Sequence, residues 1–233
     1  MLDTEREVSD MLSKNLSSNS RMNFIRKVYG ILFTQLFVTA VWIGIVAMNQ
    51  EYFINFLSNR IELFVLAITG YIISLYALGC YRQVARSVPG NYILLGIFTC
   101  SFAYISGFVT VQYHPEDIMI AGSMTAAMTL GLTLYAITTK QDFSALFAFM
   151  WSLVISLFVA VIMAVVFRNR LVQILVSVLM IVLMSVYIIF DTQLIVGGRD
   201  AELSIDDYVF AAMMLYIDIM RLFLEILKVL GKK

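Results

Sequence analysis

The chain has 233 residues, of which 61% are hydrophobic and 14% are charged, and its mean hydropathy is +0.88. A soluble domain has about 45–50% apolar and about 25% charged residues, so the composition excludes that class. The formal net charge is zero, which indicates no basic surface for nucleic acid. The composition therefore predicts an all-α membrane protein whose first partner is the lipid bilayer.

Apolar segments of spanning length follow a polar start. Residues 1–23 are polar and unpatterned, which predicts a flexible cytosolic tail. The first apolar run begins near Val28 and is too long, and too far from the terminus, to be a cleaved signal peptide. A membrane-spanning helix needs about 20 mostly apolar residues. Residues 24–233 hold seven such segments and predict a seven-helix bundle with spans at about 28–48, 62–81, 92–112, 117–137, 144–167, 171–196 and 208–230.

Basic residues in the short connections favour a cytosolic N-terminus. Seven crossings from that side place the following on the inner side: Arg6, Lys14, Arg21, Arg26, Lys27, Arg82, Arg86, Lys140 and Arg199. The outer side then holds a smaller set: Arg60, Arg168, Arg170, Lys228, Lys232 and Lys233. A re-entrant last segment would move the last three lysines inside and increase this bias. We favour seven crossings because the last apolar run is long enough to span.

Two aspartates lie inside the last two predicted spans. Asp191 is about five residues from the end of its span and Asp218 about ten residues into the next, at depths of roughly 8 and 15 Å from the inner side. A charged aspartate near the middle of a span costs about 2.5–3.5 kcal/mol, so such residues face a partner or a cavity. For either aspartate alone, a structural hydrogen bond is a sufficient explanation. Two aspartates at compatible depth favour function.

A pair of carboxyl groups in contact would share one proton, because two close anions repel each other. The shared proton would hold the two helices together. Its loss would leave two anions or a hard-oxygen site for Ca²⁺, with Asp191 and Asp218 as ligands. A proton-gated cation pathway is therefore chemically reasonable, with Ca²⁺ and H⁺ as partners.

Enzyme and receptor functions have little support in the motifs. Intramembrane aspartyl proteases of the presenilin type also pair two aspartates, but they carry Gly-x-Gly-Asp and Pro-Ala-Leu, and this chain has neither. The Asp-Arg-Tyr and Asn-Pro-x-x-Tyr motifs of seven-helix receptors are missing too. His114, the one histidine, follows the third span and is interpreted as a solvated loop residue. We therefore expect no enzyme activity and no cofactor.

Several longer motifs carry a family resemblance. They are YIIFDTQLIVGG, LSIDDYVFAAMMLYIDIMRLFLEILKVLG, FIRKVYGIL, NYILLGIFTCSFAYISG and LTLYAITTKQDFS, within residues 22–231. Together they resemble the transmembrane Bax inhibitor motif family, in its Lifeguard and Golgi anti-apoptotic branch. The resemblance implies a seven-helix bundle with the last helix at its centre. It also implies a pH-sensitive Ca²⁺ leak that suppresses cell death, usually in Golgi or endoplasmic reticulum membranes and sometimes in the plasma membrane.

The resemblance also assigns roles to residues. The paired aspartates of the family match Asp191 and Asp218, as a proton-sensing gate. A basic residue at the inner end of the second helix pairs with the first aspartate in the family, and Arg82 is the best match, with Arg86 in reserve. Ordinary positive-inside anchoring explains both arginines equally well.

This chain departs from the family at two positions after Asp218. Arg221 stands where relatives commonly have Asn, and Glu225 stands where they have an uncharged residue. The three residues share one helix face. Arg221 either competes with Asp191 for Asp218, which would lower the pH at which the pair closes, or it pairs only with Glu225.

A short acidic motif precedes the last span. Ser204 and Asp207 have the spacing of a capping box for that helix. Asp206 and Asp207 would then lie at the inner mouth, where they cap the helix and concentrate cations. Two functions stay open: a proton-regulated Ca²⁺ pathway, and a non-conducting adaptor that binds cell-death regulatory membrane proteins.

Overall fold

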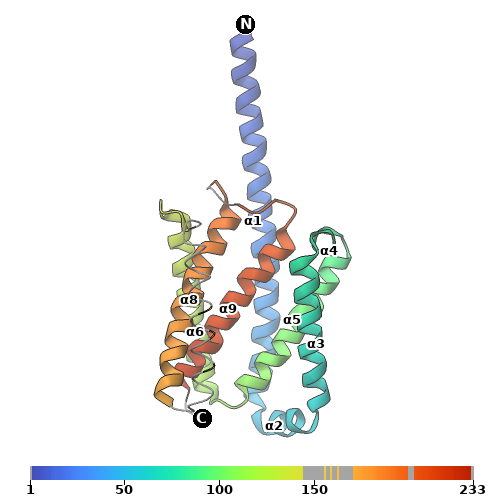
Figure 1. The fold of residues 1–233 in the computed structure, drawn as a ribbon, viewed down its shortest axis with the longest axis vertical. Coiled ribbons are helices and arrows are strands. Elements are labelled where there is room, and N and C mark those ends of the chain that lie inside the picture. The colour runs from blue at the N-terminus through green and yellow to red at the C-terminus, as the bar shows by residue number, and fades with distance from the viewer. Residues whose placement is uncertain are drawn as a thin grey trace.

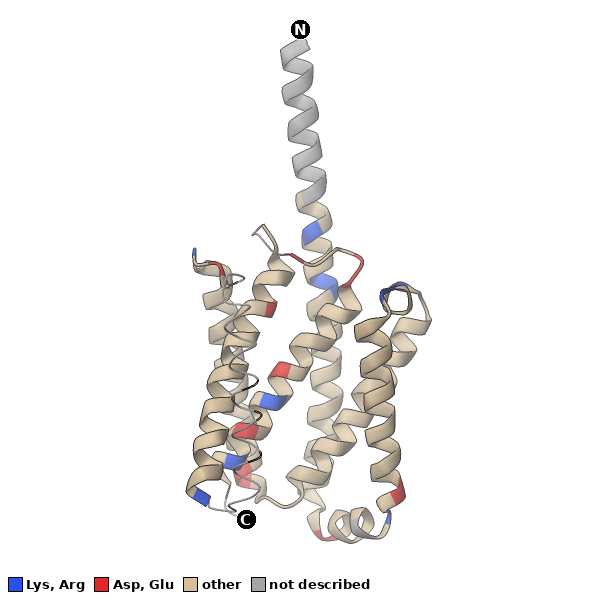
Figure 2. Cartoon of the chain, viewed as in Figure 1, with Lys and Arg blue, Asp and Glu red and all other residues tan. Residues whose placement is uncertain are grey.

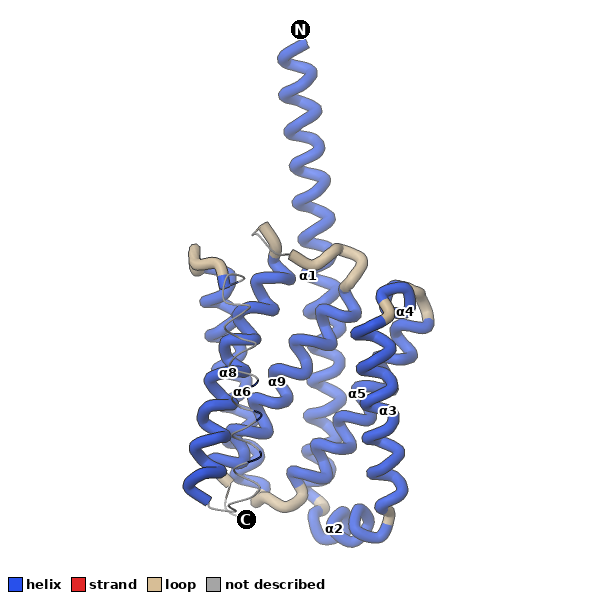
Figure 3. Tube along the Cα trace, in the orientation of Figure 1, coloured by secondary structure: helices blue, strands red, loops and turns tan. Residues whose placement is uncertain are grey.

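The protein is described here by a computed structural model. The described residues are 2–143, 155, 158, 162, 170–198 and 202–231, and the side chains of residues 2–17 and Ser58 are excluded. All long elements in this part of the chain are helices (Figures 1 and 3). Their bounds are α1 Leu2–Met48, α2 Gln50–Asn59, α3 Ile61–Cys80, α4 Arg82–Arg86, α5 Gly90–Thr110, α6 Pro115–Thr138, α8 Arg170–Val196 and α9 Tyr208–Leu230.

Five of these helices are long and apolar enough to cross a membrane. They are Ser18–Met48, Ile61–Cys80, Gly90–Thr110, Pro115–Thr138 and Arg170–Val196. They correspond to the first, second, third, fourth and sixth predicted segments. The fifth segment, 144–167, lies outside the described residues apart from three single positions. The seventh corresponds to α9, which carries four charged side chains, and so the count of seven spans stays a prediction.

The first helix begins earlier than expected. Residues 1–23 were predicted to be a flexible tail, but the helix of the first span extends back to Leu2. A second difference lies between the first two spans, where α2 forms a short helix across the end of the bundle (Figure 1). The apolar side of α2, with Phe53 and Leu57, packs on Trp42 and Val46 of α1. This burial explains why the connection is helical.

The helices alternate in direction between two ends of the bundle (Figure 1). We call one of them the Arg21 end: α3, α6 and α8 end there, and α5 and α9 begin there. α9 runs obliquely between α8 and α5 (Figure 1) and contacts α1, α3, α4, α5, α6 and α8. More than half of its residues are buried, whereas α3 directs many apolar side chains outward, such as Leu66 and Ile73. An apolar outer surface is what lipid requires.

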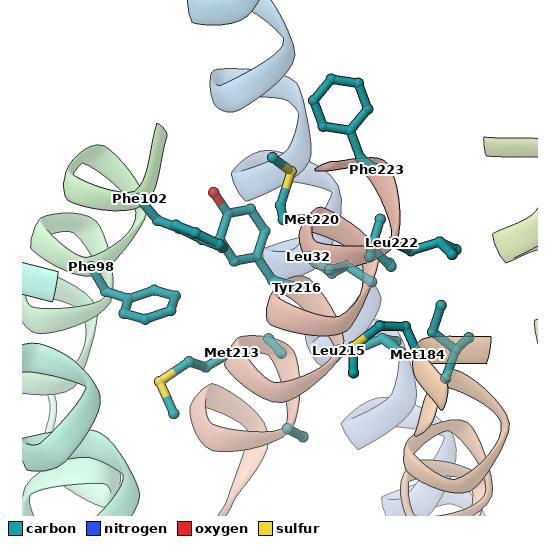
Figure 4. Close-up of a cluster of buried hydrophobic side chains, with 14 of the residues drawn as sticks. Leu32, Phe98, Phe102, Met184, Met213, Leu215, Tyr216, Met220, Leu222 and Phe223 are labelled. Carbon is teal, nitrogen blue, oxygen red and sulfur yellow. The ribbon is translucent and has the colours of Figure 1, made fainter. Parts of the chain in front are cut away.

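The apolar core gathers around α9. Tyr216 is fully buried and points toward Phe98 and Phe102 of α5 (Figure 4), with ring centroids 5.9 and 5.7 Å apart in edge-to-face geometry. Met184 of α8 and Leu32 of α1 belong to the same cluster. Close packing of this kind holds helices together in lipid, where the hydrophobic effect between them is weak.

Candidate functional site

The two aspartates predicted from the sequence come together between α8 and α9. Asp191 is 4% exposed and Asp218 is 9% exposed. Their carboxyl groups lie within hydrogen-bonding reach of each other. The second oxygen of Asp218, Oδ2, is buried and has no hydrogen-bond partner. Two carboxyl groups attract each other only when one of them donates a proton, so this contact calls for a shared proton.

Charged residues near the pair are concentrated on α9. Figure 2 shows them along α9 and at the ends of the bundle, while the middle parts of α3 and α5 have none. Arg221 acts electrostatically on Asp218, and Tyr187 of α8 lies within electrostatic reach of both aspartates. Glu225 pairs with Lys228 at 2.6 Å. Arg221 was one predicted partner of Glu225. In the structure, Glu225 pairs instead with Lys228, three residues after it on the same helix face.

Arg86 was predicted as a reserve partner for Asp191, and it pairs elsewhere. Its guanidinium binds Asp207 through both oxygens, Nε to Oδ1 at 2.7 Å and Nη2 to Oδ2 at 2.9 Å. This contact raises the pKa of the Arg86 guanidinium above its ordinary value. Arg82, the first choice, is exposed and has no ion pair among the described residues. The reason is that α4 turns the chain after α3 and brings Arg86 to the start of α9.

The same ion pair replaces the predicted capping box. Asp207 occupies the N-cap of α9, but its side chain makes no capping bond because both oxygens bind Arg86. Ser204 instead accepts a hydrogen bond from the Asp206 backbone at 3.4 Å. Asp206 is exposed and Asp207 is buried. Asp206 and Asp207 were both expected at the inner mouth of the pathway. Of the two, only Asp206 has an exposed side chain, because Asp207 is buried against Arg86.

Gln193 is a residue that the sequence analysis did not single out. It lies two residues after Asp191, is 3% exposed, and donates from Nε2 to the backbone carbonyl of Gln141 at 3.1 Å. Its Oε1 accepts the backbone N–H of Phe143 at 3.1 Å. Gln193 thus fastens α8 to the segment that follows α6. An amide side chain within the apolar run of the sixth predicted span was the sequence signal that could have identified Gln193.

In the sequence analysis, Arg21 served only as one of the basic residues that indicate the membrane orientation. It donates three hydrogen bonds to backbone carbonyls at the end of α8 and just beyond it. No sequence motif signals such a contact, because every residue has a carbonyl to offer.

The pair alone does not form a resident metal site. No group of three or more His, Cys, Asp or Glu side chains suited to a metal occurs among the residues that the structure describes. Asp191 and Asp218 offer four carboxylate oxygens between them. In protein sites, Ca²⁺ is bound by about six to eight oxygen ligands.

Comparison with known proteins shows the family. Residues 21–233 match the family model described as "Inhibitor of apoptosis-promoting Bax1". The chain is 27% identical to "Protein lifeguard 3" of Homo sapiens over 235 residues, 98% of this chain and 75% of the relative. It is 30% identical to "Bax inhibitor 1" of Schizosaccharomyces pombe over 212 residues, 91% of this chain and 77% of the relative. The protein, with its several apolar helices, therefore belongs to this family of Bax inhibitor membrane proteins.

Proposed function

We propose that the protein is a passive, proton-regulated pathway for Ca²⁺ that lowers the Ca²⁺ content of an internal store and so suppresses cell death. The observation that carries this proposal is the contact between two buried carboxyl groups, Asp191 and Asp218, on adjacent helices. Ca²⁺ is the transported ion, and no cofactor takes part.

The chemistry of the pair supports gating by pH. With one shared proton, the carboxyl groups hold α8 against α9. When that proton leaves, two anions remain in a medium of low dielectric constant and repel each other. Separation of α8 and α9 would expose hard oxygen atoms to a cation. Flux is therefore expected to rise as the pH rises.

The arrangement of the helices supports a response of the whole bundle. α9 contacts six other helices, so a shift of α9 changes packing on several sides. α6 ends at the Arg21 end and α8 begins at the opposite end. This placement of the two helix ends fits the proposed seven crossings.

The alternative is a non-conducting adaptor. The family description names an inhibitor of the apoptosis-promoting protein Bax1, and inhibition of a protein can proceed by binding alone. In that case, the aspartate pair only holds the bundle together. An adaptor requires no ion flux from purified protein.

The two functions separate in liposomes that contain the purified protein. Ca²⁺ influx is measured from about pH 5 to about pH 8, with Asp191→Asn and Asp218→Asn beside the wild type. Glu51→Gln is the matched control, because that carboxylate is exposed on α2 and lies outside the pair. A pH profile that shifts or disappears only in the two pair variants supports the pathway. Folded wild-type protein without flux at any pH would leave the adaptor as the function.

The location is an internal membrane, of the Golgi or the endoplasmic reticulum, with the N-terminus in the cytosol. The fold supports this orientation by bringing basic residues of α1 and α4 to the Arg21 end, and positive residues favour the cytosolic side. Protease protection of a tag at each terminus in sealed vesicles tests the orientation. Protection of the N-terminal tag would contradict it.

A further inference from the structure

The end of α8 that carries Asp191 is closed by a side chain from another helix. Arg21 of α1 donates from Nη2 to the carbonyl of Leu194 at 2.6 Å and from Nε to that of Val196 at 3.1 Å. Its third bond runs from Nη1 to the carbonyl of Leu203, beyond the turn, at 2.6 Å. One guanidinium therefore joins α1, the last turn of α8 and the segment that leads to α9.

This contact has a clear electrostatic basis. The last carbonyls of a helix have no N–H partner within the helix, and they carry the negative end of its dipole. A cation placed there satisfies them and is stabilised by the dipole. Arginine suits the position because its N–H groups point in fixed directions within one plane. α1 thus supplies the C-terminal cap of α8.

The turn after α8 is shaped to admit the guanidinium. Gly197 has a φ of +73°, and a Cβ atom there would lie 2.6 Å from the guanidinium carbon of Arg21 and 2.6 Å from Oε2 of Glu202. Gly198 has a nearly equal φ of +75°, but a Cβ atom there would meet nothing within 4 Å. Glu202 accepts a hydrogen bond from the Gly198 backbone at 3.1 Å and acts electrostatically on Arg21. Gly197 therefore leaves room for Arg21, and Gly198 serves only the backbone.

We propose that Arg21 is a positioning residue for the proton-sensing pair. Asp191 lies three residues before Leu194, less than one turn from the carbonyl that Arg21 holds. By fixing the end of α8 to α1, Arg21 sets the depth and the rotation of Asp191 against Asp218. This inference rests on the proposed function of the pair.

Other groups also face the pair and stay in place in the test. On α8 the titratable neighbour is Tyr187, and on α9 the charged neighbour is Arg221. On α1, Tyr29 lies beside Thr192, the residue after Asp191. Among the described residues, Arg21 differs from these in contacting the backbone of α8 instead of its side chains.

Two variants break the contact from its two sides. Arg21→Lys keeps the charge but loses the planar set of three donors. Gly197→Ala keeps Arg21 but fills the space that its guanidinium and the Glu202 carboxylate occupy. The matched controls are Arg26→Lys, an exposed arginine on the same helix, and Gly198→Ala, which carries the same backbone strain without touching Arg21.

The first readout is the pH midpoint of Ca²⁺ flux in liposomes. A loosely held pair loses its shared proton more easily, so Arg21→Lys and Gly197→Ala each shift the midpoint to lower pH by about half a unit or more. The double variant shifts it no further than the larger single shift, because both changes remove one contact. Shifts equal to those of the controls, or shifts that add in full, would overturn the inference.

Two further readouts do not depend on flux. The amide hydrogen of Leu203, which bonds to the carbonyl of Leu194, exchanges faster in both variants than in their controls. The infrared absorption of the protonated carboxyl group, identified by its loss in the double variant Asp191→Asn/Asp218→Asn, titrates at lower pH in the variants. If wild-type protein does not conduct, the proposed function fails, and this titration then decides the inference. Titration at the wild-type pH would contradict it.

Discussion

Tyr216 of α9 and Thr39 of α1 share a hydrogen bond of 2.8 Å inside the bundle. The hydroxyl of Thr39 donates to the carbonyl of Gln35 on its own helix at 2.9 Å, so Tyr216 is the donor to Thr39. Both side chains are at most 1% exposed. The bond therefore ties one face of α9 to α1, while Asp218 lies against α8.

Removal of this bond is expected to loosen α9. Tyr216→Phe keeps the ring and removes only the hydroxyl, and it should lower the free energy of unfolding by about 0.5–1.5 kcal/mol. Thr39→Val should cost a similar amount, and the double variant less than the sum of the two. Chemical denaturation in detergent measures all three. Thr34→Val is the control, because Thr34 is exposed and bonds only within α1; an equal loss there would contradict an interhelical role.

Charge-reversing substitutions test whether the Arg86–Asp207 ion pair stabilises the fold. Arg86→Asp should lower the thermal unfolding midpoint by a few degrees, because Asp207 is nearly buried and would then face a like charge. Asp207→Arg added to Arg86→Asp should recover much of the loss. Arg82→Asp is the control, since Arg82 is exposed and has no ion pair in the part of the chain described. A double variant no more stable than either single one would show that the pair contributes nothing.

Gln193 should tolerate substitution poorly. Gln193→Leu leaves the carbonyl of Gln141 and the N–H of Phe143 without their partner, at a cost of about 1–3 kcal/mol. Hydrogen exchange should show the loosening first at Phe143, whose amide bonds directly to the side chain. Gln173→Leu, at an exposed position of the same helix, should leave stability nearly unchanged. Unaltered exchange at Phe143 would refute the fastening role.

Alkaline pH should weaken the end of the bundle opposite to Arg21. Burial raises the pKa of Tyr113 above its ordinary value of about 10, and Glu225 adds to the shift. The folded state thus holds the phenol proton more tightly than the unfolded state does. The resulting stabilisation is fully present below about pH 10 and is lost as the pH rises above it.

Comparison with Tyr113→Phe isolates this effect. The difference in unfolding midpoint between wild type and variant should be constant below about pH 10, and wild type should lose stability relative to the variant above it. Tyr52→Phe, at a residue that is 65% exposed, is the matched control. A difference that stays constant at every pH would rule out the contribution of Tyr113.

The sequence alone predicted the bounds of α8 and α9 and the depths at which Asp191 and Asp218 face each other. Apolar runs bounded by polar turns set the ends of both helices within about a residue, and the fixed rise of a helix turned positions into depths. The family resemblance suggested Arg82, with Arg86 in reserve, as the partner of Asp191, and sequence position alone could not show that α4 directs Arg86 to Asp207. The bonds of Arg21 and Gln193 involve backbone groups, which no side-chain pattern reveals.

The composition of α9 bears on how the protein enters its membrane. α9 carries Asp218, Arg221, Glu225 and Lys228 within 23 residues, which keeps it out of the set of helices apolar enough to span alone. Each such charge near the centre of a lone helix costs about 2.5–3.5 kcal/mol during insertion. Contact with α8 relieves part of that cost, since Asp218 meets Asp191 there. α9 is also synthesised after α8, so the two helices are expected to leave the translocon as a hairpin, with assembly of the carboxyl pair as a step of biogenesis.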